Sequence, residues 1–400
     1  MDALMLPLNW QKVRLGDIAE IIGGGTPSTQ ITSFWNGSIN WFTPTEIGIT
    51  KYVYKSQRTI TPLGLKKSSA KLLPIGTILL TSRASIGDCA ILKVVATTNQ
   101  GFQSLIPLEK INNEFLYYLM LTLKNKLLKL ASGSTFLEVS PNKIKNLLIP
   151  LPPLNEQIAI ANILSDVDHY LYSLDALILK KESVKKALSF ELLSQRKRLK
   201  GFNQAWKKVR LGDIAEIKRG ASPRPIENPK WFCANSNVGW VRISDISKNS
   251  RFLYKTAQKL SKKGIEKSRF IKQNSLIMSM CATIGKPIIT KIDTCIHDGF
   301  VVFENPKIDL NYLYYFLCCI EKEWLESGQQ GSQVNLNVDL IKNKEVFYPK
   351  DLNEQIAIAN ILSDLDSEII SLKNKKRQFE NIKKTLNHDL MSAKIRVLKK

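Results

Sequence analysis

The sequence has few of the residues from which metal sites, disulfide frameworks and membrane spans are built. Its 400 residues contain three histidines, His169, His297 and His388, far apart in the chain, and six cysteines without a C-x-x-C pair. We therefore expect reduced thiols, no metal site and no bound cofactor. The apolar runs are too short to span a membrane and the first residues lack a secretion signal, so we expect a cytoplasmic protein with no membrane partner.

Recognisable catalytic motifs are also missing. The chain has no G-x-G-x-x-G, no G-x-x-x-x-G-K-[ST] and no Asn/Asp-Pro-Pro-aromatic tetrapeptide. We expect no strand before glycines 23–25, and no Lys-Ser/Thr pair follows them, which favours a turn over a phosphate site. We predict a binding protein without catalytic residues.

Acidic residues are scarce relative to basic ones. There are 35 Asp and Glu against 58 Lys and Arg, which gives a formal net charge of +23. An excess of this size costs self-repulsion in the folded chain and indicates a polyanionic partner, most simply nucleic acid.

A long duplication organises the chain. The stretch Leu154 to Asp168 returns as Leu352 to Asp366 with a single change, Val167 to Leu365. The stretch Trp10 to Ile21 likewise returns as Trp206 to Ile217, with Lys207 in place of Gln11. Two copies with this long a period indicate a duplicated domain pair with pseudo-twofold symmetry, not a repeat array.

Between these shared ends the pattern predicts mixed α and β structure. Strands are expected at 39–43 and 76–82 and a helix at 113–130; their counterparts are 239–243, 275–279 and 310–327. Landmarks such as Gln100-Gly-Phe102 and Asp298-Gly-Phe300 correspond, whereas 46–73 and 245–272 differ heavily. We predict two domains, 1–150 and 204–350, that share a framework but carry different surfaces, and helical segments at 151–203 and 351–400.

Both helical segments carry a heptad seam. Positions 164 to 199 in strict 3-4 spacing are apolar at eight of eleven places, and 362 to 397 at nine of eleven. This predicts an α+β fold whose two α/β domains are separated by an antiparallel coiled coil, with two separate amphipathic helices as the alternative. The seam suggests that position 181 lies opposite about 380, which would crowd Lys181, Lys185, Lys376 and Lys383 at one level.

The run Leu151-Pro-Pro-Leu-Asn-Glu-Gln-Ile158 leading into a long helix, twice and each time after a variable domain, resembles the DNA-specificity subunit of type I restriction-modification systems. The resemblance covers essentially the whole chain. The second copy departs from it at Tyr348-Pro-Lys-Asp-Leu352, and Cys281 stands where the first copy has Arg83.

The resemblance implies a concrete function in phage defence. Each target-recognition domain would read one half of a bipartite, asymmetric site in double-stranded DNA, and the helix pair would set the unread spacer. Two modification subunits would carry S-adenosylmethionine and the methyltransferase chemistry. Restriction subunits would supply ATP- and Mg-dependent translocation and cleavage. A twofold scaffold that pairs two proteins and touches DNA incidentally is the alternative, and a stand-alone methyltransferase or nuclease with degenerate motifs is a third reading.

The candidate DNA contacts are basic residues of the divergent segments and the tyrosines interleaved with them. They are Lys51, Tyr52, Tyr54, Lys55, Arg58, Lys66, Lys67 and Arg83 in the first domain and Arg242, Lys248, Arg251, Lys262, Lys263 and Lys267 in the second. For each lysine a solvated surface charge is an equally good reading. The candidates for subunit binding are Glu156, Gln157, Glu354 and Gln355, for which ordinary helix-start chemistry is the alternative.

Overall fold

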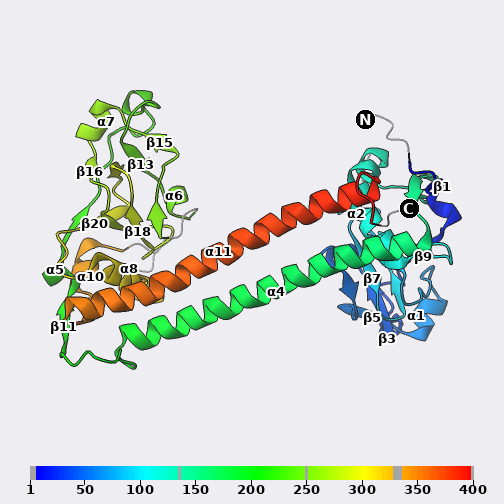
Figure 1. Cartoon of the computed structure of the whole chain (residues 1–400), viewed down its shortest axis with the longest axis horizontal. Helices are drawn as coiled ribbons and strands as arrows, with labels where there is room; N and C mark the ends of the chain where they lie inside the picture. Colours follow the sequence, from blue (N-terminus) through cyan, green and yellow to red (C-terminus); the bar gives the residue numbers. More distant parts are fainter. Residues whose placement is uncertain (1–5, 134–136, 248–250, 328–335, 398–400) are drawn as a thin grey trace. The chain divides into compact units, whose positions relative to one another are not determined.

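A computed structural model of the chain describes residues 6–133, 137–247, 251–327 and 336–397. It divides into two units, Met1–Asp175 with Asn374–Lys400, and Ala176–Lys373. The division falls within both of the 40-residue helices, α4 (Leu154–Leu193) and α11 (Leu352–Met391). Each unit therefore consists of one duplicated domain together with part of each long helix (Figure 1).

The first unit is built on a five-stranded sheet, a three-stranded sheet and a two-stranded ribbon. The five-stranded sheet has the order β2 (Ala19–Gly23), β9 (Gln103–Pro107), β6 (Ile78–Leu80), β7 (Cys89–Leu92) and β4 (Tyr52–Val53). The smaller sheet is β5 (Arg58–Ile60), β3 (Trp35–Phe42) and β8 (Ala96–Thr98), and the ribbon is β1 (Gln11–Arg14) with β10 (Leu148–Leu151). Its helices, apart from the long ones, are η1 (Leu15–Asp17), η2 (Thr32–Phe34), η3 (Pro44–Glu46), α1 (Pro62–Lys66), α2 (Asn113–Leu130) and α3 (Pro141–Lys145).

The second unit repeats this plan with one more strand. Its five-stranded sheet is β12 (Glu216–Arg219), β20 (Phe300–Glu304), β17 (Leu276–Ser279), β18 (Pro287–Thr290) and β14 (Phe252–Leu253). The second sheet is β15 (Gln258–Lys259), β13 (Gly239–Val241), β19 (Thr294–Ile296) and β16 (Arg269–Ile271), and the ribbon is β11 (Trp206–Arg210) with β21 (Glu345–Pro349). Its helices are α5 (Leu211–Ile214), η4 (Pro229–Trp231), α6 (Ile243–Ser247), α7 (Lys262–Glu266), α8 (Leu310–Cys319), α9 (Glu321–Ser327) and α10 (Val338–Asn343).

The predicted elements are present, with two differences. Helix α2 has the predicted bounds, but its counterpart is two helices, because the first ends in a cap at Ile320. The spacing of Val13, Leu15, Ile18 and Ile21 predicts one short amphipathic element at 10–22, but each half begins with a strand, a short helical turn and a second strand. The expectation that no strand precedes glycines 23–25 is therefore wrong, because β2 leads directly into them. Leu15, Ile18 and Ile21 of the expected element are buried, so the apolar spacing marked the core correctly without marking the type of structure.

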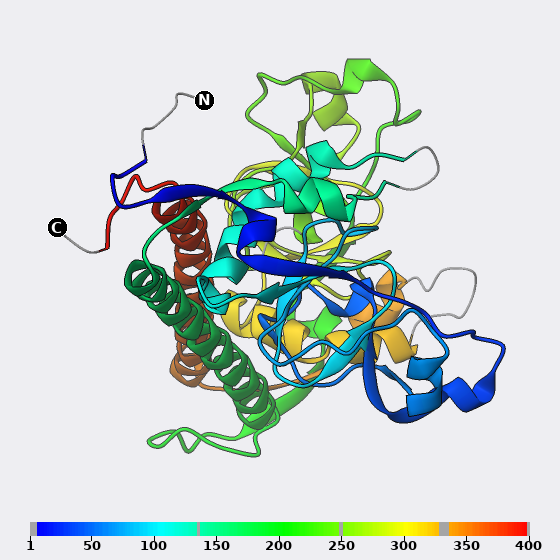
Figure 2. The ribbon, with the colours of Figure 1, turned by 90° about the vertical axis from the view of Figure 1, so that its right-hand side faces the viewer.

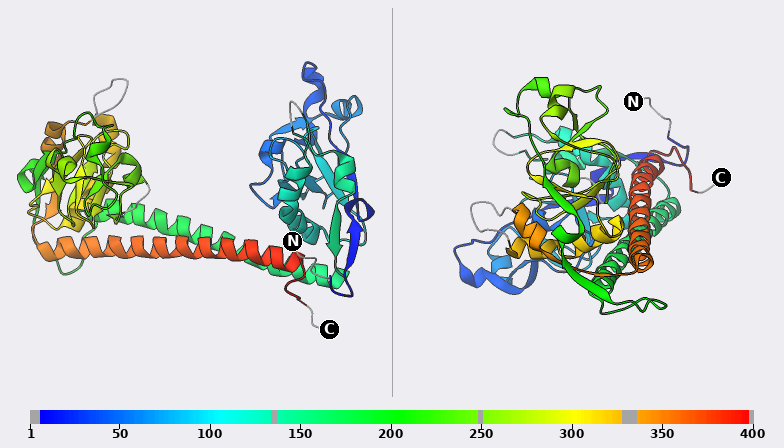
Figure 3. Two further views of the ribbon diagram at one scale, coloured as in Figure 1. Left: turned by 90° about the horizontal axis from the view of Figure 1, so that it is seen from above. Right: turned by 90° about the vertical axis from the view of Figure 1, so that its left-hand side faces the viewer.

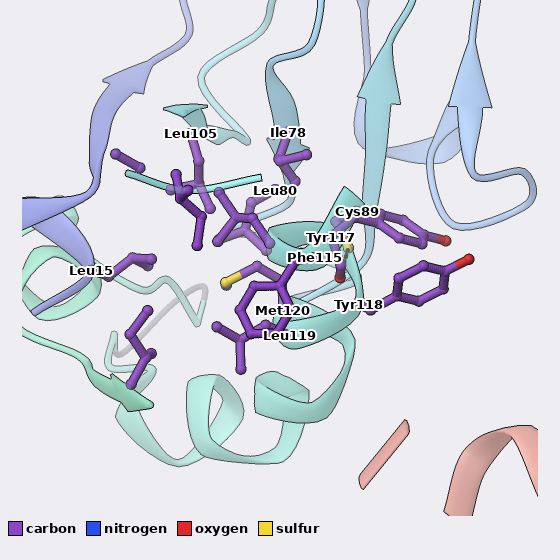
Figure 4. Packing of buried hydrophobic residues seen from close by; sticks show 14 of the residues in the cluster. Leu15, Ile78, Leu80, Cys89, Leu105, Phe115, Tyr117, Tyr118, Leu119 and Met120 are labelled. Carbon is purple, nitrogen blue, oxygen red and sulfur yellow. Dashed lines mark hydrogen bonds between the residues drawn. The ribbon is translucent and has the colours of Figure 1, made fainter. Parts of the chain in front are cut away.

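Each domain helix packs against the five-stranded sheet. In the first unit Phe115, Leu119 and Met120 of α2 meet Ile78 and Leu80 of β6 in one buried cluster (Figure 4). Asn112 caps α2 by accepting a hydrogen bond from the Phe115 amide at 2.9 Å, and Asp309 caps α8 in the same way. The helix thus has a fixed start and an apolar face toward the sheet.

The two long helices pair antiparallel within each unit. Figures 2 and 3 show the two helices side by side. In the first unit Lys376 lies 2.6 Å from Asp175, and Lys383 pairs with Asp168. In the second unit Lys185 lies 2.5 Å from Asp366 and Lys181 2.8 Å from Glu368. The fold class predicted from the sequence, two α/β domains with an antiparallel helix pair, is therefore confirmed.

The expected register of the helix pair is wrong. Position 181 faces about residue 368 instead of 380, and the four mid-helix lysines each meet a carboxylate instead of one another. The cause is the starting point: α4 begins at Leu154, and its first turns already pack, with Ile160 and Ala161 buried. A seam counted from 164 omits these turns.

The seam positions themselves are correct, although the helices end sooner than expected. Every position of both heptad series is buried or half-buried. Gln195 and Ala393, near the ends of the two series, lie beyond the helices with φ of 59°. A left-handed residue after the last turn is a common way for a helix to end. In the described part of the chain no helix is long and apolar enough to cross a membrane.

Candidate nucleic-acid interface

The start of each long helix is held by a carboxylate clamp. In the first unit Glu156 is 2% exposed and accepts hydrogen bonds from Arg396, at 2.7 and 3.1 Å, and from Trp10 Nε1 at 3.1 Å. In the second unit Glu354 accepts from Arg198, at 3.2 and 3.0 Å, and from Trp206 Nε1 at 3.3 Å. A bidentate guanidinium fixes the angle between the two groups as well as their distance.

The adjacent glutamines join the helix start to the domain. Gln157 accepts a hydrogen bond from the Asn112 amide at 2.8 Å and donates to the Pro152 carbonyl at 2.9 Å. Gln355 does the same with Asp309, at 2.7 Å, and Pro349, at 2.9 Å. The four predicted subunit-binding residues are thus buried and bonded inside their own unit. These contacts account for their identity in the two halves, and a docking role for them stays a prediction.

Two of the predicted DNA contacts lie largely enclosed in a polar network beside the long helices. The Lys51 side chain is 11% exposed, pairs with Glu114 and donates to the Tyr118 hydroxyl at 2.9 Å. Arg251, 8% exposed, donates to Tyr315 at 3.2 Å and also to Asn311 and Ser363. These contacts give both cations a structural role that exposed lysines and arginines would not have.

Each network ends on an aspartate of a long helix. The Tyr118 hydroxyl donates to Asp168 at 2.5 Å, and the Tyr315 hydroxyl donates to Asp366 at 2.8 Å. Lys383 and Lys185 from the opposite long helix pair with the same two carboxylates. One aspartate in each unit therefore links the domain helix to both long helices.

The other predicted contacts lie mostly on short helices and loops, and Arg58 lies on the smaller sheet of the first domain. Arg58 is exposed on β5, with its guanidinium carbon 3.8 Å from the ring centroid of Trp35. The exposed lysines of this group follow or form the short helices α1 and α7, namely Lys66, Lys67, Lys262, Lys263 and Lys267. Tyr54, Lys55 and Arg242 are also exposed, and Tyr52 is half-buried. Lys248 lies outside the described residues.

A second group of polar side chains stands at the x-Gly-Phe turn in front of β9 and β20. In the first unit Gln100 is exposed and its Oε1 accepts from Thr26, while Arg83 lies 2.8 Å from Glu138. The two positions are neighbours because the Ser82 amide donates to the Gly101 carbonyl at 2.8 Å. Gly24 passes so close to this turn that an added Cβ would lie 1.9 Å from the Asn99 carbonyl. The run of glycines therefore permits close backbone packing.

In the second unit the same turn carries different side chains. Asp298 accepts from Ser222 Oγ at 2.8 Å and from Arg224 Nη2 at 2.9 Å. Its backbone carbonyl accepts from Arg219 Nε at 2.7 Å. Burial alone would raise the pKa of Asp298, but the Ser222 hydrogen bond, a backbone hydrogen bond and the Arg224 charge hold this pKa below its usual value.

The largely buried His297 precedes the turn and accepts a hydrogen bond from it. Burial lowers the pKa of His297 to about 4, and the ring is therefore neutral near pH 7. The nearby Arg242 charge also lowers this pKa, whereas the Asp298 charge raises it. Its Nδ1 accepts a hydrogen bond from the Gly299 amide at 2.9 Å, as a neutral ring can. Beside it lies a hollow of about 340 Å³ lined by Arg219, Met280, Cys281, His297, Asp298, Gly299 and Leu336.

The sequence profile described as "Type I restriction modification DNA specificity domain" matches this chain twice, at residues 7–181 and 203–381. The chain belongs to this family. A relative, the type I restriction enzyme MjaIX specificity subunit of Methanocaldococcus jannaschii, is 29% identical over 99% of this chain and 96% of its own length.

Solved structures of specificity subunits share the fold. The type I restriction-modification S subunit from M. genitalium has a TM-score of 0.58 and 18% identity, over 97% of both chains. A chain from work on the assembly and conformational transition of a type I system has a TM-score of 0.64 and 18% identity, over 96% of this chain and 98% of its own. Specificity subunits are the non-catalytic, DNA-recognising members of these restriction-modification systems, so this chain is a DNA-binding subunit and not an enzyme.

Four residues at the turn were missed by sequence reasoning: Gln100, Arg219, Arg224 and Asp298. A signal was present, because Gln100-Gly-Phe102 and Asp298-Gly-Phe300 align between the halves and differ at their first position only. The match marks the framework that the two domains share. A variable residue inside an otherwise shared turn also marks a place where the two domains of a specificity subunit present different chemistry.

Proposed function

We propose that this chain recognises a bipartite, asymmetric target in double-stranded DNA, with one half read by each unit. The observation that carries the proposal is a shared framework with divergent surface chemistry. The strand order of the two five-stranded sheets is the same, and the clamps at Glu156 and Glu354 are equivalent. The exposed residues at the turns and on the smaller sheets differ. Two domains that share a framework and carry different exposed groups suit two different half-sites.

The long helices supply the spacer in this proposal. Each has 40 residues, which at about 1.5 Å per residue corresponds to about 60 Å. Successive major grooves on one face of DNA are separated by about 34 Å. Helices of this length are therefore sufficient to hold two recognition domains on non-adjacent base pairs.

The chain directs other subunits to the target. Two modification subunits would supply S-adenosylmethionine and methyl transfer, and restriction subunits would supply ATP- and Mg-dependent translocation and cleavage. Support comes from family membership and from the net charge of +23, which attracts DNA without specifying sequence. The chain itself carries no cofactor in this proposal.

A domain exchange tests the proposal. Residues 22–150 are replaced by the matching segment of a family member, the chain is assembled with its modification subunits, and methylated positions are mapped in DNA. The expected result is a new sequence in one half of the target, with the other half and the spacer retained. A matched exchange of the corresponding second-domain segment should change the other half alone. Changes in both halves from a single exchange would overturn the assignment of one domain to one half-site.

A further inference from the structure

The exposed cations of the two units include two physical classes that suit different DNA contacts. Among the described residues, Lys66, Lys67 and Lys262 form no hydrogen bond or ion pair through their ammonium groups. Arg83 and Arg224 are also accessible, with side chains 42% and 72% exposed, but each is held by a carboxylate. A mobile ammonium suits contact with phosphate, which positions a protein without reading sequence. A guanidinium held in one orientation suits a base edge, where discrimination depends on angle as well as distance.

The x-Gly-Phe turn occupies the same framework position in both units. The Gly25 amide donates to the Thr98 carbonyl at 2.8 Å, and the Ala221 amide donates to the Ile296 carbonyl at 3.0 Å. The next residue in each loop then donates its hydroxyl to the turn side chain, Thr26 to Gln100 and Ser222 to Asp298. The scaffold thus fixes one side chain in each unit by the same device, while the identity of that side chain differs.

The chemistry of the two turn side chains differs in the way that base recognition requires. Gln100 presents an amide whose Nε2 donates and whose Oε1 accepts, a pair that matches N7 and N6 of adenine. Both carboxylate oxygens of Asp298 accept hydrogen bonds within the protein, one from Ser222 and one from Arg224. The group that the second unit presents to a ligand is therefore the Arg224 guanidinium, which Asp298 orients. Guanidinium nitrogens pair with O6 and N7 of guanine.

We propose that the x-Gly-Phe turn determines the base read by each unit, with Gln100 contacting adenine in one half-site and Arg224, held by Asp298, contacting guanine in the other. The inference rests on the proposed function, because it assigns chemistry to the same DNA-reading surface. Arg224 is the reading residue of the second unit, and Asp298 is its positioning residue.

The experiment uses the full chain assembled with the modification subunits of its own system. Methylated positions are mapped in DNA for the wild type and for Arg224→Ala, Arg224→Lys, Asp298→Asn and Gln100→Ala. Arg224→Ala should reduce discrimination at one G·C pair by about ten- to a hundredfold, with the other half of the motif unchanged. Arg224→Lys keeps the charge but not the fork, so it should relax the same position. Asp298→Asn should relax that position less strongly. Gln100→Ala should relax one A·T pair in the opposite half.

Lys267→Ala is the matched control, because it removes one exposed positive charge from the same unit. It should weaken binding to all sequences and leave the motif intact. An Arg224→Ala complex that behaves like Lys267→Ala would overturn the inference and make Arg224 a phosphate contact. If an alanine variant does not assemble, Arg224→Lys and Asp298→Asn decide: an unchanged motif in both contradicts the assignment. A wild-type motif without two separated halves would refute the proposed function itself, which keeps the two failures distinct.

Discussion

The two units differ least where they join the long helices and most where their exposed turns lie. At the helix start, Glu156, Arg396 and Trp10 match Glu354, Arg198 and Trp206 in both identity and bonding. One layer farther from the helix start, the buried cation has changed between the units. At the x-Gly-Phe turns the side chains have different chemistry altogether. Divergence after duplication is therefore smallest at the helix start and largest at the exposed turns, as expected if the helices impose one geometry on two recognition surfaces.

The middle layer shows how a shared position can change without losing its role. Lys51 of the first unit is neutralised by Glu114, whereas Arg251 of the second unit meets the neutral Asn311. Arg251 compensates with hydrogen bonds to Tyr315 and Ser363 and with a position 4.7 Å from the Phe252 ring centroid. A guanidinium can stay buried without a dedicated carboxylate because it distributes its charge over several donors.

The largest expected difference concerns alkaline pH and lies between the domain helices α2 and α8. Burial is the main cause of the raised pKa of Tyr117 and Tyr118 in α2 and of Tyr312, Tyr314 and Tyr315 in α8. These phenols stay protonated in the folded chain, so unfolding releases protons above the ordinary tyrosine pKa and stability falls as pH rises. Each contributes about 1.4 kcal/mol per pH unit above pH 10. By about pH 11 the cost is about 4 kcal/mol for the three in α8 and about 3 kcal/mol for the two in α2.

Tyr312→Phe tests this difference, because Phe115 occupies the equivalent place in the first unit. The variant loses a hydrogen bond from the Tyr312 hydroxyl to the Phe347 carbonyl, 3.0 Å long, so it should be less stable near neutral pH. Its stability should nevertheless fall less steeply with pH. Urea unfolding, followed by chemical labelling of peptides from each unit at about pH 8 and about pH 11, measures the two slopes. A slope for the second unit that equals the wild-type slope would contradict this explanation.

A slightly smaller effect is expected from breaking the two clamps. Glu156→Ala leaves the Arg396 guanidinium and Trp10 Nε1 without their acceptor, which should cost about 3 kcal/mol. Hydrogen exchange should then accelerate in β1, β10 and the first turns of α4. Glu354→Ala should have the same effect on β11, β21 and the first turns of α11, so each variant is the control for the other. Equal loss of protection in both units from one substitution would show that the units do not open separately.

Much of the architecture follows from the sequence because the decisive signals are local. The duplicated ends, the bounds of α2 and the heptad seam each depend on residues close together in the chain. The register of the helix pair does not, because it is set by contacts such as Glu156 with Arg396, separated by 240 residues. The position of Lys51 likewise depends on distant residues, because Glu114 and Tyr118 enclose it. The sequence around Lys51 is typical of an exposed basic loop and therefore gave no sign of this. The turn residues were visible in the alignment of the two halves, but their hydroxyl and carboxylate partners were not.

The smallest expected effect comes from converting the middle layer of one unit into that of the other. Glu114→Asn in the first unit removes the carboxylate that pairs with Lys51 and accepts from the Tyr52 hydroxyl at 2.6 Å, so it should destabilise that unit by about 2 kcal/mol. Lys51→Arg alone should lower stability less, because the guanidinium keeps the positive charge. Some loss is still expected, because the larger group must fit beside Tyr118. Together the two changes reproduce the Arg251 and Asn311 pair, and Ser165 is available in the place of Ser363. The double variant should therefore recover about 1 kcal/mol relative to the sum of the single variants. Urea unfolding of the wild type, the two single variants and the double variant gives the coupling energy. If the stability losses of the single variants add to that of the double variant within about 0.5 kcal/mol, the two networks cannot replace one another.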